Sequence, residues 1–237
     1  MCHFAILDPN KIRINKRDII VDMDFLLGTE ILEERTSPIN GKIKVVKSLG
    51  FGTYIQVNNL TQSGGVIEDI WRSTLRTINK QLPTINNCLI LGLGGGTAAK
   101  LVRKFWPEAK ITGVDIDPIM VELGTRHLGL GNSKVKTIIG DAYQYSLKHK
   151  AKSEKFDLVL VDLYIGYKFP RRFETQNYIH LVRNILSRSG IAVFNRLYYG
   201  EKRPEAMKFG KKLEKVFSKV EYFYPEANVM FICYNKD

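Results

Sequence analysis

From Cys88 onward, short apolar runs alternate with amphipathic segments, and this alternation limits the possible folds more than any other feature of the sequence. Short apolar runs are typical of buried strands, and apolar residues three or four positions apart are typical of helices. A regular strand–helix order predicts a mostly parallel, doubly wound sheet with helices on both faces. The strands are expected at residues 88–91, 110–114, 135–139, 156–161 and 190–194, and the helices at residues 98–105, 118–127, 143–149, 175–186 and 205–217.

The C-terminal end of the chain departs from this order. Residues 220–223 and 229–234 are two further apolar runs with no helix between them, so we expect an antiparallel strand pair there. Residues 156–161 are the most apolar run of all and are expected at the centre of the sheet. The predicted fold class is therefore α/β, with a Rossmann-like sheet that ends in an antiparallel pair.

The N-terminal part has shorter apolar runs and more turns. Residues 18–23 form one such run, and residues 42–47 and 53–57 flank a glycine-containing turn that predicts a hairpin. A helix from residue 66 to 78 follows. We therefore expect a small N-terminal β-rich domain over residues 1–65 and the Rossmann-like domain over residues 66–237.

The formal net charge of +12 raises the question of an anionic partner. Lysines and arginines are spread along the whole chain, and no recognition module for DNA or RNA accompanies them. The pattern favours a solvated basic surface. Nucleic-acid binding is disfavoured but not excluded.

Cysteine usage indicates a reducing compartment. The three cysteines, Cys2, Cys88 and Cys233, are odd in number and far apart, unlike a disulfide framework or a zinc cluster. We expect a cytoplasmic protein, because the sequence also has no signal-like N-terminus and no apolar run long enough to cross a membrane. The four histidines show no metal-ligand spacing, so no metal is expected.

The turn after the first predicted strand carries the strongest functional signal. Its residues Gly92, Gly94, Gly95 and Gly96 let the backbone turn sharply and allow a ligand to approach it closely, and Thr97 then begins a helix whose N-terminus favours an anionic group. Such turns serve several cofactors, and a tight turn without a ligand is the alternative.

Three acids follow at the carboxyl ends of the next strands, where doubly wound sheets bind ligands. Asp115 is placed to accept hydroxyl protons from a ribose. Asp141 has two equal interpretations, an acceptor for an adenine amino group or a helix cap. Asp117 is expected to cap a helix, and Asp162 ends the central strand.

These segments resemble the class I methyltransferase motifs, and more narrowly those of the spermidine synthase (polyamine aminopropyltransferase) family. The similar segments are residues 68–71, 89–96, 114–117, 140–142 and 156–162 in the larger domain, and residues 34–45 and 59–65 in the smaller one. The resemblance covers roughly residues 30–235.

The resemblance implies an S-adenosylmethionine or decarboxylated S-adenosylmethionine site. Gln62 would contact the methionine-derived part, Asp115 with Ile116 the ribose, and Asp141 with Ala142 the adenine. Asp162 would accept a proton from the attacking group, with Tyr164 nearby as a second catalytic candidate. The family's members form dimers, which leaves a homodimer open here.

Three departures from the family pattern bear on the substrate. Thr97 or its neighbour stands where the family has an aspartate, Trp71-Arg72-Ser73 replaces a Tyr-His-Glu stretch, and the loop after Asp162 has the cations Lys168, Arg171 and Arg172 instead of a second acid. Since nearby cations repel a polyamine, we expect methyl transfer to a neutral or anionic small acceptor. Aminopropyl transfer is the alternative.

The aromatic residues of the same loop have two interpretations. Tyr164, Tyr167 and Phe169 either line an acceptor pocket, which we favour, or pack the loop. Outside the transferase class, a nicotinamide-dependent oxidoreductase would also use Asp115, although the terminal antiparallel pair argues against it. A non-catalytic or nucleic-acid-associated protein that retains the fold is the third hypothesis.

Overall fold

The computed structural model describes residues 11–13, 20–22, 28–150 and 155–235. Within them, β1 (Lys11–Arg13) pairs antiparallel with β2 (Ile20–Asp22). The strand expected over residues 18–23 overlaps β2, while its flanking residues, together with Cys2 and His3, lie outside the described residues.

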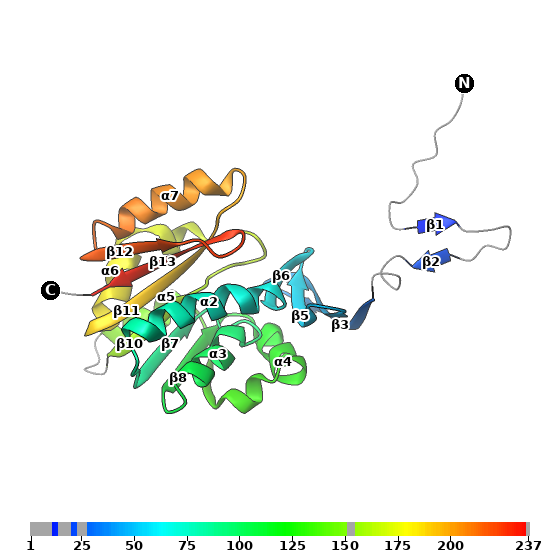
Figure 1. The fold of residues 1–237 in the computed structure, drawn as a ribbon, viewed down its shortest axis with the longest axis horizontal. Coiled ribbons are helices and arrows are strands. Elements are labelled where there is room, and N and C mark those ends of the chain that lie inside the picture. The colour runs from blue at the N-terminus through cyan, green and yellow to red at the C-terminus, as the bar shows by residue number, and fades with distance from the viewer. Residues whose placement is uncertain (1–10, 14–19, 23–27, 151–154, 236–237) are drawn as a thin grey trace, which may run out of the picture.

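A seven-stranded sheet forms the centre of the molecule, in the order β12-β13-β11-β10-β7-β8-β9 (Figure 1). The pairings among β7 to β11 are parallel, whereas β13 runs antiparallel to both β11 and β12. The predicted fold class is confirmed, and β10 is the middle strand as expected. The strands are β7 (Asn87–Leu91), β8 (Lys110–Asp115), β9 (Val135–Ile139), β10 (Phe156–Val161), β11 (Leu186–Leu197), β12 (Lys219–Phe223) and β13 (Asn228–Tyr234).

Helices cover both faces of this sheet because successive strand residues point to opposite sides. Leu89 and Val159 pack under α5, α6 and α7, and Ile90 and Leu160 pack under α2 and α3. The helices are α2 (Val66–Gln81), α3 (Thr97–Phe105), α4 (Pro118–His127), α5 (Ala142–Lys150), α6 (Gln176–Ile185) and α7 (Lys202–Leu213). Two 3-10 turns complete the set, η1 (Leu130–Ser133) between α4 and β9, and η2 (Arg171–Glu174) between β10 and α6.

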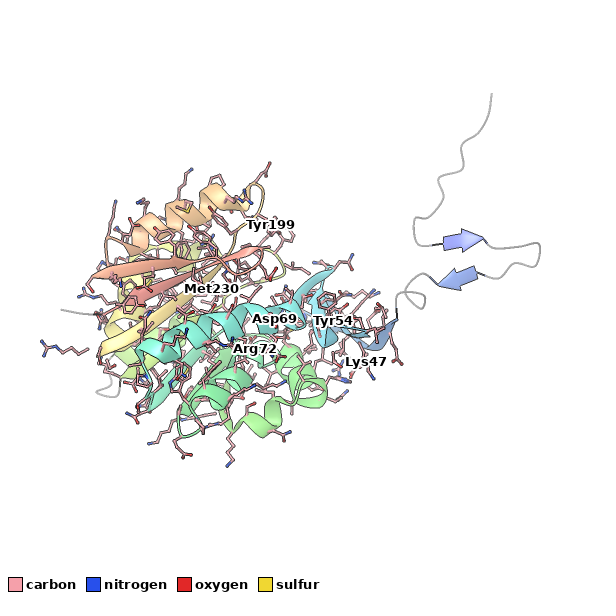
Figure 2. All side chains as sticks on the ribbon, in the orientation of Figure 1. Lys47, Tyr54, Asp69, Arg72, Tyr199 and Met230 are labelled. Atoms are coloured by element: carbon pink, nitrogen blue, oxygen red, sulfur yellow. The ribbon has the colours of Figure 1, made fainter. Side chains whose placement is uncertain are left out.

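Helix α2 is amphipathic, as its residue spacing predicts. Its inner face carries the buried side chains of Trp71 and Leu75, which belong to the core. On its outer side Asp69 and Arg72 form an ion pair at 2.9 Å (Figure 2). One face of the helix therefore covers the sheet, while the other presents charges to solvent.

The element boundaries differ from expectation at α7 and β11, and α2 ends three residues later than predicted, at Gln81. The last helix is α7 over Lys202–Leu213, three or four residues earlier than predicted, because Val216 and Phe217 are core residues that follow the helix instead of ending it. The strand expected at residues 190–194 extends in both directions to form β11, which pairs with β13 along most of its length. No helix within the described ranges is both long and apolar enough to cross a membrane.

A smaller antiparallel sheet lies at the side of α4 (Figure 1). Its strands are β3 (Thr29–Ser37), β4 (Gly41–Ser48), β5 (Gly52–Val57) and β6 (Leu60–Gly64). The predicted hairpin is β4–β5, whereas β3 and β6 are strands that the sequence pattern does not predict. Ile43 and Ile55 pack with Met120 and Leu123 of α4, so the small sheet joins the larger one through this helix. A domain boundary between residues 65 and 66 stays a prediction.

Helix α4 approaches the glycine turn more closely than any side chain would allow. A Cβ atom on Gly124 would lie 2.4 Å from Gly95 Cα and 2.5 Å from the Gly95 carbonyl oxygen. Backbone atoms cannot give way as a flexible side chain can, so this contact requires glycine at position 124.

We expect Gly124→Ala to destabilise the protein by about 1–3 kcal/mol, although alanine favours helix by about 1 kcal/mol, because the helix must move away from the turn. Urea unfolding measures the change. Gly131→Ala is the matched control, since its Cβ would meet nothing nearer than 3.6 Å. Equal stability of the two variants would contradict the packing described.

Candidate functional site

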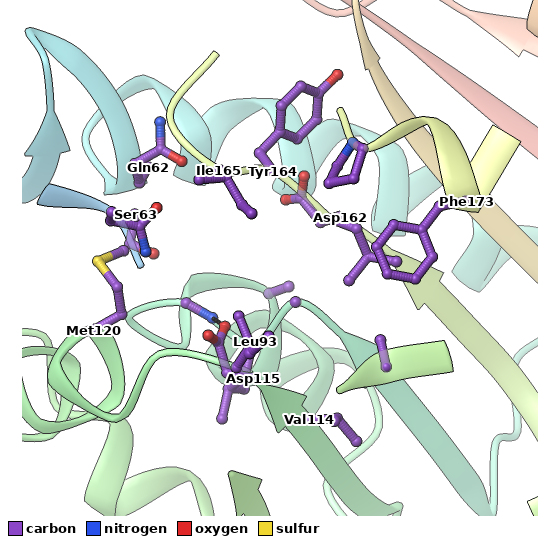
Figure 3. Close-up of a pocket in the computed structure, with 18 of the residues that line it drawn as sticks. Gln62, Ser63, Leu93, Val114, Asp115, Met120, Asp162, Tyr164, Ile165 and Phe173 are labelled. Atoms are coloured by element: carbon purple, nitrogen blue, oxygen red, sulfur yellow. Dashed lines mark hydrogen bonds between the residues drawn. The ribbon is translucent and has the colours of Figure 1, made fainter. Parts of the chain in front are cut away.

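A cleft opens where β7, β8 and β10 end, beside the small sheet (Figure 3). Its walls combine apolar side chains with a few polar and charged groups, which suits a small-molecule site. We call it the main cleft. Figure 3 shows Gln62 and Ser63 on one side, Asp115 and Leu93 below, and Asp162 across from them. The cofactor-binding and catalytic residues predicted from the sequence all line this cleft except Gly95 and Gly96, which lie in the turn beneath it.

The glycine turn is shaped by close backbone contacts. Gly92, Gly94 and Gly96 have φ values of 89°, 54° and 87°, which residues with a Cβ rarely adopt. A Cβ on Gly92 would lie 2.0 Å from the Asp162 carbonyl oxygen. The turn therefore brings the ends of β7 and β10 together.

The amides of this turn are already engaged within the protein. Gly94 N–H donates to Asp115 Oδ2 at 2.6 Å, Gly95 N–H donates to Ser63 Oγ at 2.8 Å, and Gly96 N–H donates to the Leu93 carbonyl at 3.0 Å. Three amides that a free turn would offer to an anion are thus used by neighbours. The turn serves a ligand mainly through close approach of its backbone.

Thr97 begins α3 and links it to the small sheet. Its hydroxyl oxygen accepts a hydrogen bond from Gly64 N–H at 2.7 Å, and the side chain is buried. Together with the Ser63 contact to Gly95, this bond fixes β6 against the turn.

Asp115 stands at the end of β8 with a fixed orientation. Its Oδ1 accepts from Asp117 N–H at 2.9 Å, while Oδ2 is held by Gly94. Burial raises the pKa of this carboxyl, opposed by its backbone hydrogen bonds. The next residue, Ile116, also lines the cleft. Asp117 caps α4 through Ile119 N–H, as predicted.

Asp141 performs the capping role that was one of its two interpretations. Its Oδ1 accepts from Gln144 N–H at 3.0 Å at the start of α5, and Oδ2 forms an ion pair with Arg172. Asp141, Ala142 and Arg172 all line the cleft. A contact with adenine stays a prediction for Asp141 and Ala142.

Gln62 lies on β6 at the opposite wall. Its Nε2 donates to the Gly166 carbonyl at 3.3 Å and to the Leu60 carbonyl at 3.4 Å. Both bonds use the amide nitrogen, and the side chain faces the cleft (Figure 3). The amide oxygen can therefore accept a hydrogen bond from a ligand.

Asp162 is the acid at the centre of the site. Trp71 Nε1–H donates to its Oδ2 at 3.1 Å, and Asn195 Nδ2–H donates to its Oδ1 at 2.8 Å. Burial is the largest influence on this carboxyl and raises its pKa to about 6, while the two hydrogen bonds act in the opposite direction. A carboxyl with such a pKa can exchange a proton near neutral pH.

Tyr164 is placed differently from what its catalytic assignment requires. Its hydroxyl oxygen accepts from Leu197 N–H at 2.8 Å, and Figure 3 shows this hydroxyl pointing away from Asp115 and Leu93. Burial raises the pKa of the phenol. The ring forms part of the wall, and a role in proton transfer stays a prediction.

The other two aromatic residues of this loop lie outside the main cleft. Tyr167 is exposed, and Phe169 packs on the core, so neither lines the cleft. The acceptor pocket that we favoured for them is wrong at these two positions.

A second cavity adjoins the main cleft at Asp162, and we call it the side cavity. The two share Gln62, Ile67, Asp162 and Tyr164 in their walls. Glu226, from the turn between β12 and β13, adds a second carboxylate. The remaining polar side chains of its lining are Asn59, Thr61, Asn195, Tyr199 and Asn228.

The positions of the loop cations bear on the expected repulsion of a cationic substrate. No lysine or arginine of the described chain lines the side cavity. Lys168 and Arg171 are exposed and line neither space, and Arg172 is paired with Asp141. The loop therefore places none of its cations in the wall of this cavity, while the predicted repulsion of a cationic substrate stays a prediction.

Sequence reasoning misses Asn195, and it notes Trp71 as a departure from the family pattern without giving it a contact in the site. The helical spacing by itself indicates that Trp71 is a core position, which gives no reason to expect its contact with Asp162. Asn195 directly follows the predicted strand 190–194, so the rule that selects Asp162, a polar residue at the carboxyl end of a parallel strand, could have found it.

Comparison with known proteins agrees with this geometry. Residues 88–190 match a family model described as a methyltransferase domain. A polyamine aminopropyltransferase from Vibrio vulnificus is 31% identical over 48% of this chain and 38% of its own length. An eEF1A lysine and N-terminal methyltransferase homolog from Drosophila melanogaster is 28% identical over 92% of this chain and 32% of its own length. The chain thus spans less than half the length of these curated relatives.

Solved structures show the same fold. A spermidine synthase from Thermotoga maritima superposes with a TM-score of 0.70 at 14% identity, covering 86% of this chain and 72% of that one. Human methyltransferase-like protein 13, in complex with SAH, gives a TM-score of 0.57 at 22% identity, covering 71% and 79%. At such identities the likeness concerns the fold alone.

The burial of Asp162 has a consequence for stability. Its pKa is raised above the ordinary value of 3.8 to about 6, so the folded state disfavours the ionised form. The associated stability is fully present below about pH 4 and is lost as the pH rises through about 6. A change of one unit in pKa corresponds to about 1.4 kcal/mol.

We therefore expect the free energy of unfolding of Asp162→Asn, relative to that of the parent protein, to rise by about 2–3 kcal/mol from about pH 4 to pH 8. This change is expected whatever the difference between the two proteins is at pH 4. Urea unfolding at several pH values measures the difference. Two parallel stability curves would contradict the raised pKa. Other titrating groups are common to both proteins and largely cancel.

Proposed function

We propose that this chain, which has the class I methyltransferase fold and a recognisable methyltransferase domain, is an S-adenosylmethionine-dependent transferase related to the spermidine synthases. It transfers a methyl group to a small acceptor. The observation that carries the proposal is the meeting of two spaces at Asp162, one shaped for a nucleoside and the other lined by carboxylates and amides.

The residues of the main cleft fit the cofactor. Asp115 is held by backbone amides with lone pairs remaining, as acceptance of two ribose hydroxyls requires. The glycines of the turn leave room for close approach. Asp141 and Ala142 would meet the adenine, between apolar walls that include Phe173 and Leu163.

The amino-acid tail of the cofactor needs both donors and acceptors. Asn40, Gln62 and Ser63 supply neutral groups of both kinds at one wall of the cleft. Thr97 adds no charge where the related family has an aspartate, so a tail carboxylate meets no repulsion there. These neutral groups favour intact S-adenosylmethionine over its decarboxylated form.

The bound cofactor would supply a methyl group activated by the positive sulfonium. The chain's own task is to align the acceptor with that carbon and to take up its proton. Asp162 lies between the two spaces and has a pKa near neutrality, so it is the proposed base. Tyr164 then contributes its ring to the wall that positions the acceptor.

The charges of the side cavity favour an amine as the acceptor. A protonated amine would be attracted by Glu226 and Asp162, and it must lose a proton before it can attack carbon. This replaces the expectation of a neutral or anionic acceptor. The amides of Asn59 and Asn228 could hydrogen-bond the rest of a small molecule.

Aminopropyl transfer from decarboxylated S-adenosylmethionine is the second candidate. The two carboxylates of the side cavity favour it, since they also suit a polyamine. The reaction would use the same base. The two candidates differ in the cofactor that binds.

The cellular compartment and the partners of the chain complete the proposal. We propose a cytoplasmic enzyme, supported by Cys88 and Cys233, which are both free and buried. No group of three or more potential metal ligands occurs in the ranges that the structure describes. The proposed partner is a small molecule, with a homodimer left open and nucleic acid disfavoured.

The first test is calorimetry with S-adenosylmethionine, its decarboxylated form, S-adenosylhomocysteine and NAD. We expect intact cofactor and S-adenosylhomocysteine to bind, and Asp115→Ala to weaken both at least tenfold, since hydrogen bonds to a charged group contribute about 1.5–3 kcal/mol. Asp69→Ala is the control, because Asp69 is an exposed acid that pairs with Arg72 outside the cleft. Preference for the decarboxylated form would select aminopropyl transfer, and binding of NAD alone would exclude both.

The second test follows methyl transfer from labelled cofactor to a panel of small mono- and diamines, with carboxylic acids as comparison. We expect transfer to amines, and Glu226→Gln to raise KM about tenfold with little change in kcat, because the carboxylate attracts the ammonium form. Glu108→Gln is the matched control, since Glu108 lines neither the main cleft nor the side cavity. Transfer to acids in preference to amines would contradict the acceptor class.

A further inference from the structure

The carboxylate of Asp162 is held by two neutral donors that come from different parts of the fold. Trp71 belongs to α2, which precedes the sheet, and Asn195 lies on β11 (Figure 1). Both residues are buried, with 1% and 3% of their surface exposed. Each donates to a different carboxylate oxygen, at 3.1 Å and 2.8 Å, so the plane of the carboxylate is fixed.

A further residue fixes the direction of the Asn195 amide. Asn228 Nδ2–H, on β13, donates to Asn195 Oδ1 at 2.7 Å, and Asn228 is itself 4% exposed. An amide turned the other way would place its oxygen against the Asp162 carboxylate and its NH₂ group against that of Asn228. The network therefore permits one orientation, with the NH₂ group directed at Asp162.

We propose that Trp71 and Asn195 are positioning residues for Asp162, which hold its carboxylate at the junction of the two cavities and favour its ionised form. The inference deepens the proposed function and rests on it for the role of Asp162 as base. Asn228 acts one step further out, through Asn195.

Neither donor can take part in the proton transfer itself. An indole N–H only donates, and a neutral amide N–H does not accept a proton. A proton taken from an acceptor therefore stays on Asp162 until it leaves through the cavities. A tyrosine at this position could both donate and accept, whereas the indole of Trp71 offers the base a donor alone.

The charged groups around Asp162 do not stabilise its ionised form. Asp115, on β8, raises the pKa of Asp162 by repulsion, and Glu226 lines the side cavity with it. Arg196 follows Asn195 on β11, but its guanidinium pairs with Glu174 and stacks on Phe169.

No ion pair within the described residues includes Asp162. The hydrogen bonds from Trp71 and Asn195 both lower the pKa of this carboxyl, against the effect of its burial. The ionised form of Asp162 therefore depends on these two neutral groups.

The chain contains its own reporter for this arrangement. It has two tryptophans, and the other, Trp106, donates its indole N–H to the Leu82 carbonyl at 3.0 Å, a partner that does not titrate. The two indole N–H resonances can be followed by NMR as the pH is changed. We expect the Trp71 resonance to titrate with a midpoint near 6, the pKa of Asp162, and the Trp106 resonance to stay constant.

Asp162→Asn is expected to abolish the titration of the Trp71 resonance. Retention of the titration in this variant, or its absence in the parent protein, would overturn the proposal. Because the measurement needs no acceptor and no turnover, it stands even if the proposed transferase activity fails.

Trp71→Phe keeps an aromatic side chain and removes the donor. We expect the pKa of Asp162, followed by its carboxyl carbon resonance, to rise by about one unit, which corresponds to about 1.4 kcal/mol for a lost hydrogen bond. In the enzyme assay, the pH profile of kcat should shift toward alkaline pH by the same amount as this pKa. Asn228→Ala, which leaves Asn195 in place but free to rotate, should give a smaller shift in the same direction.

Trp106→Phe is the matched control, and it should leave both the pKa and the pH profile unchanged. Affinity for S-adenosylhomocysteine should stay within about twofold in Asn228→Ala and Trp106→Phe, since neither Asn228 nor Trp106 lines the main cleft. A loss of activity in Trp71→Phe at every pH, with no change in the carboxyl pKa, would reduce Trp71 to a packing residue and refute its positioning role.

Discussion

The whole site depends on the close packing of the glycine turn between β7 and α3. Its backbone touches the Asp162 carbonyl on one side and Gly124 of α4 on the other, and a Cβ at either contact would collide with backbone atoms. The amides of Gly94 and Gly95 are taken by Asp115 and by Ser63 of the small sheet. One turn therefore sets the distance between the two acids of the cleft and holds the small sheet over it.

A second constraint is that the burial of Asp162 without a cation beside it lowers the stability of the protein. Asp162 faces the repulsion of Asp115 and is supported by hydrogen bonds from neutral groups. A cation at this point would stabilise the carboxylate but would also lower its basicity and repel an ammonium substrate. Functional acids are commonly kept in such unfavourable surroundings, where local stability is lost in favour of a pKa suited to proton transfer.

Much of the fold could be predicted because hydrophobic periodicity determines it. The acids of the site could be predicted because parallel strands present their carboxyl ends at one edge of the sheet. Strands β3 and β6 could not be predicted because their mixed exposure gives no clear alternation. The direction of side chains could not be predicted either: Tyr164 turns its hydroxyl to Leu197, and the loop cations lie outside the side cavity. Trp71 and Asn195 meet Asp162 only after three distant segments have folded together.

The location of the cofactor is tested most directly by a crystal structure of the protein with S-adenosylhomocysteine. We predict the ribose hydroxyls on Asp115, the sulfur facing the junction near Asp162, and the amino-acid tail beside Gln62 and Ser63. A nucleoside bound elsewhere, for instance in the groove that Lys110 and Lys136 line, would contradict this assignment.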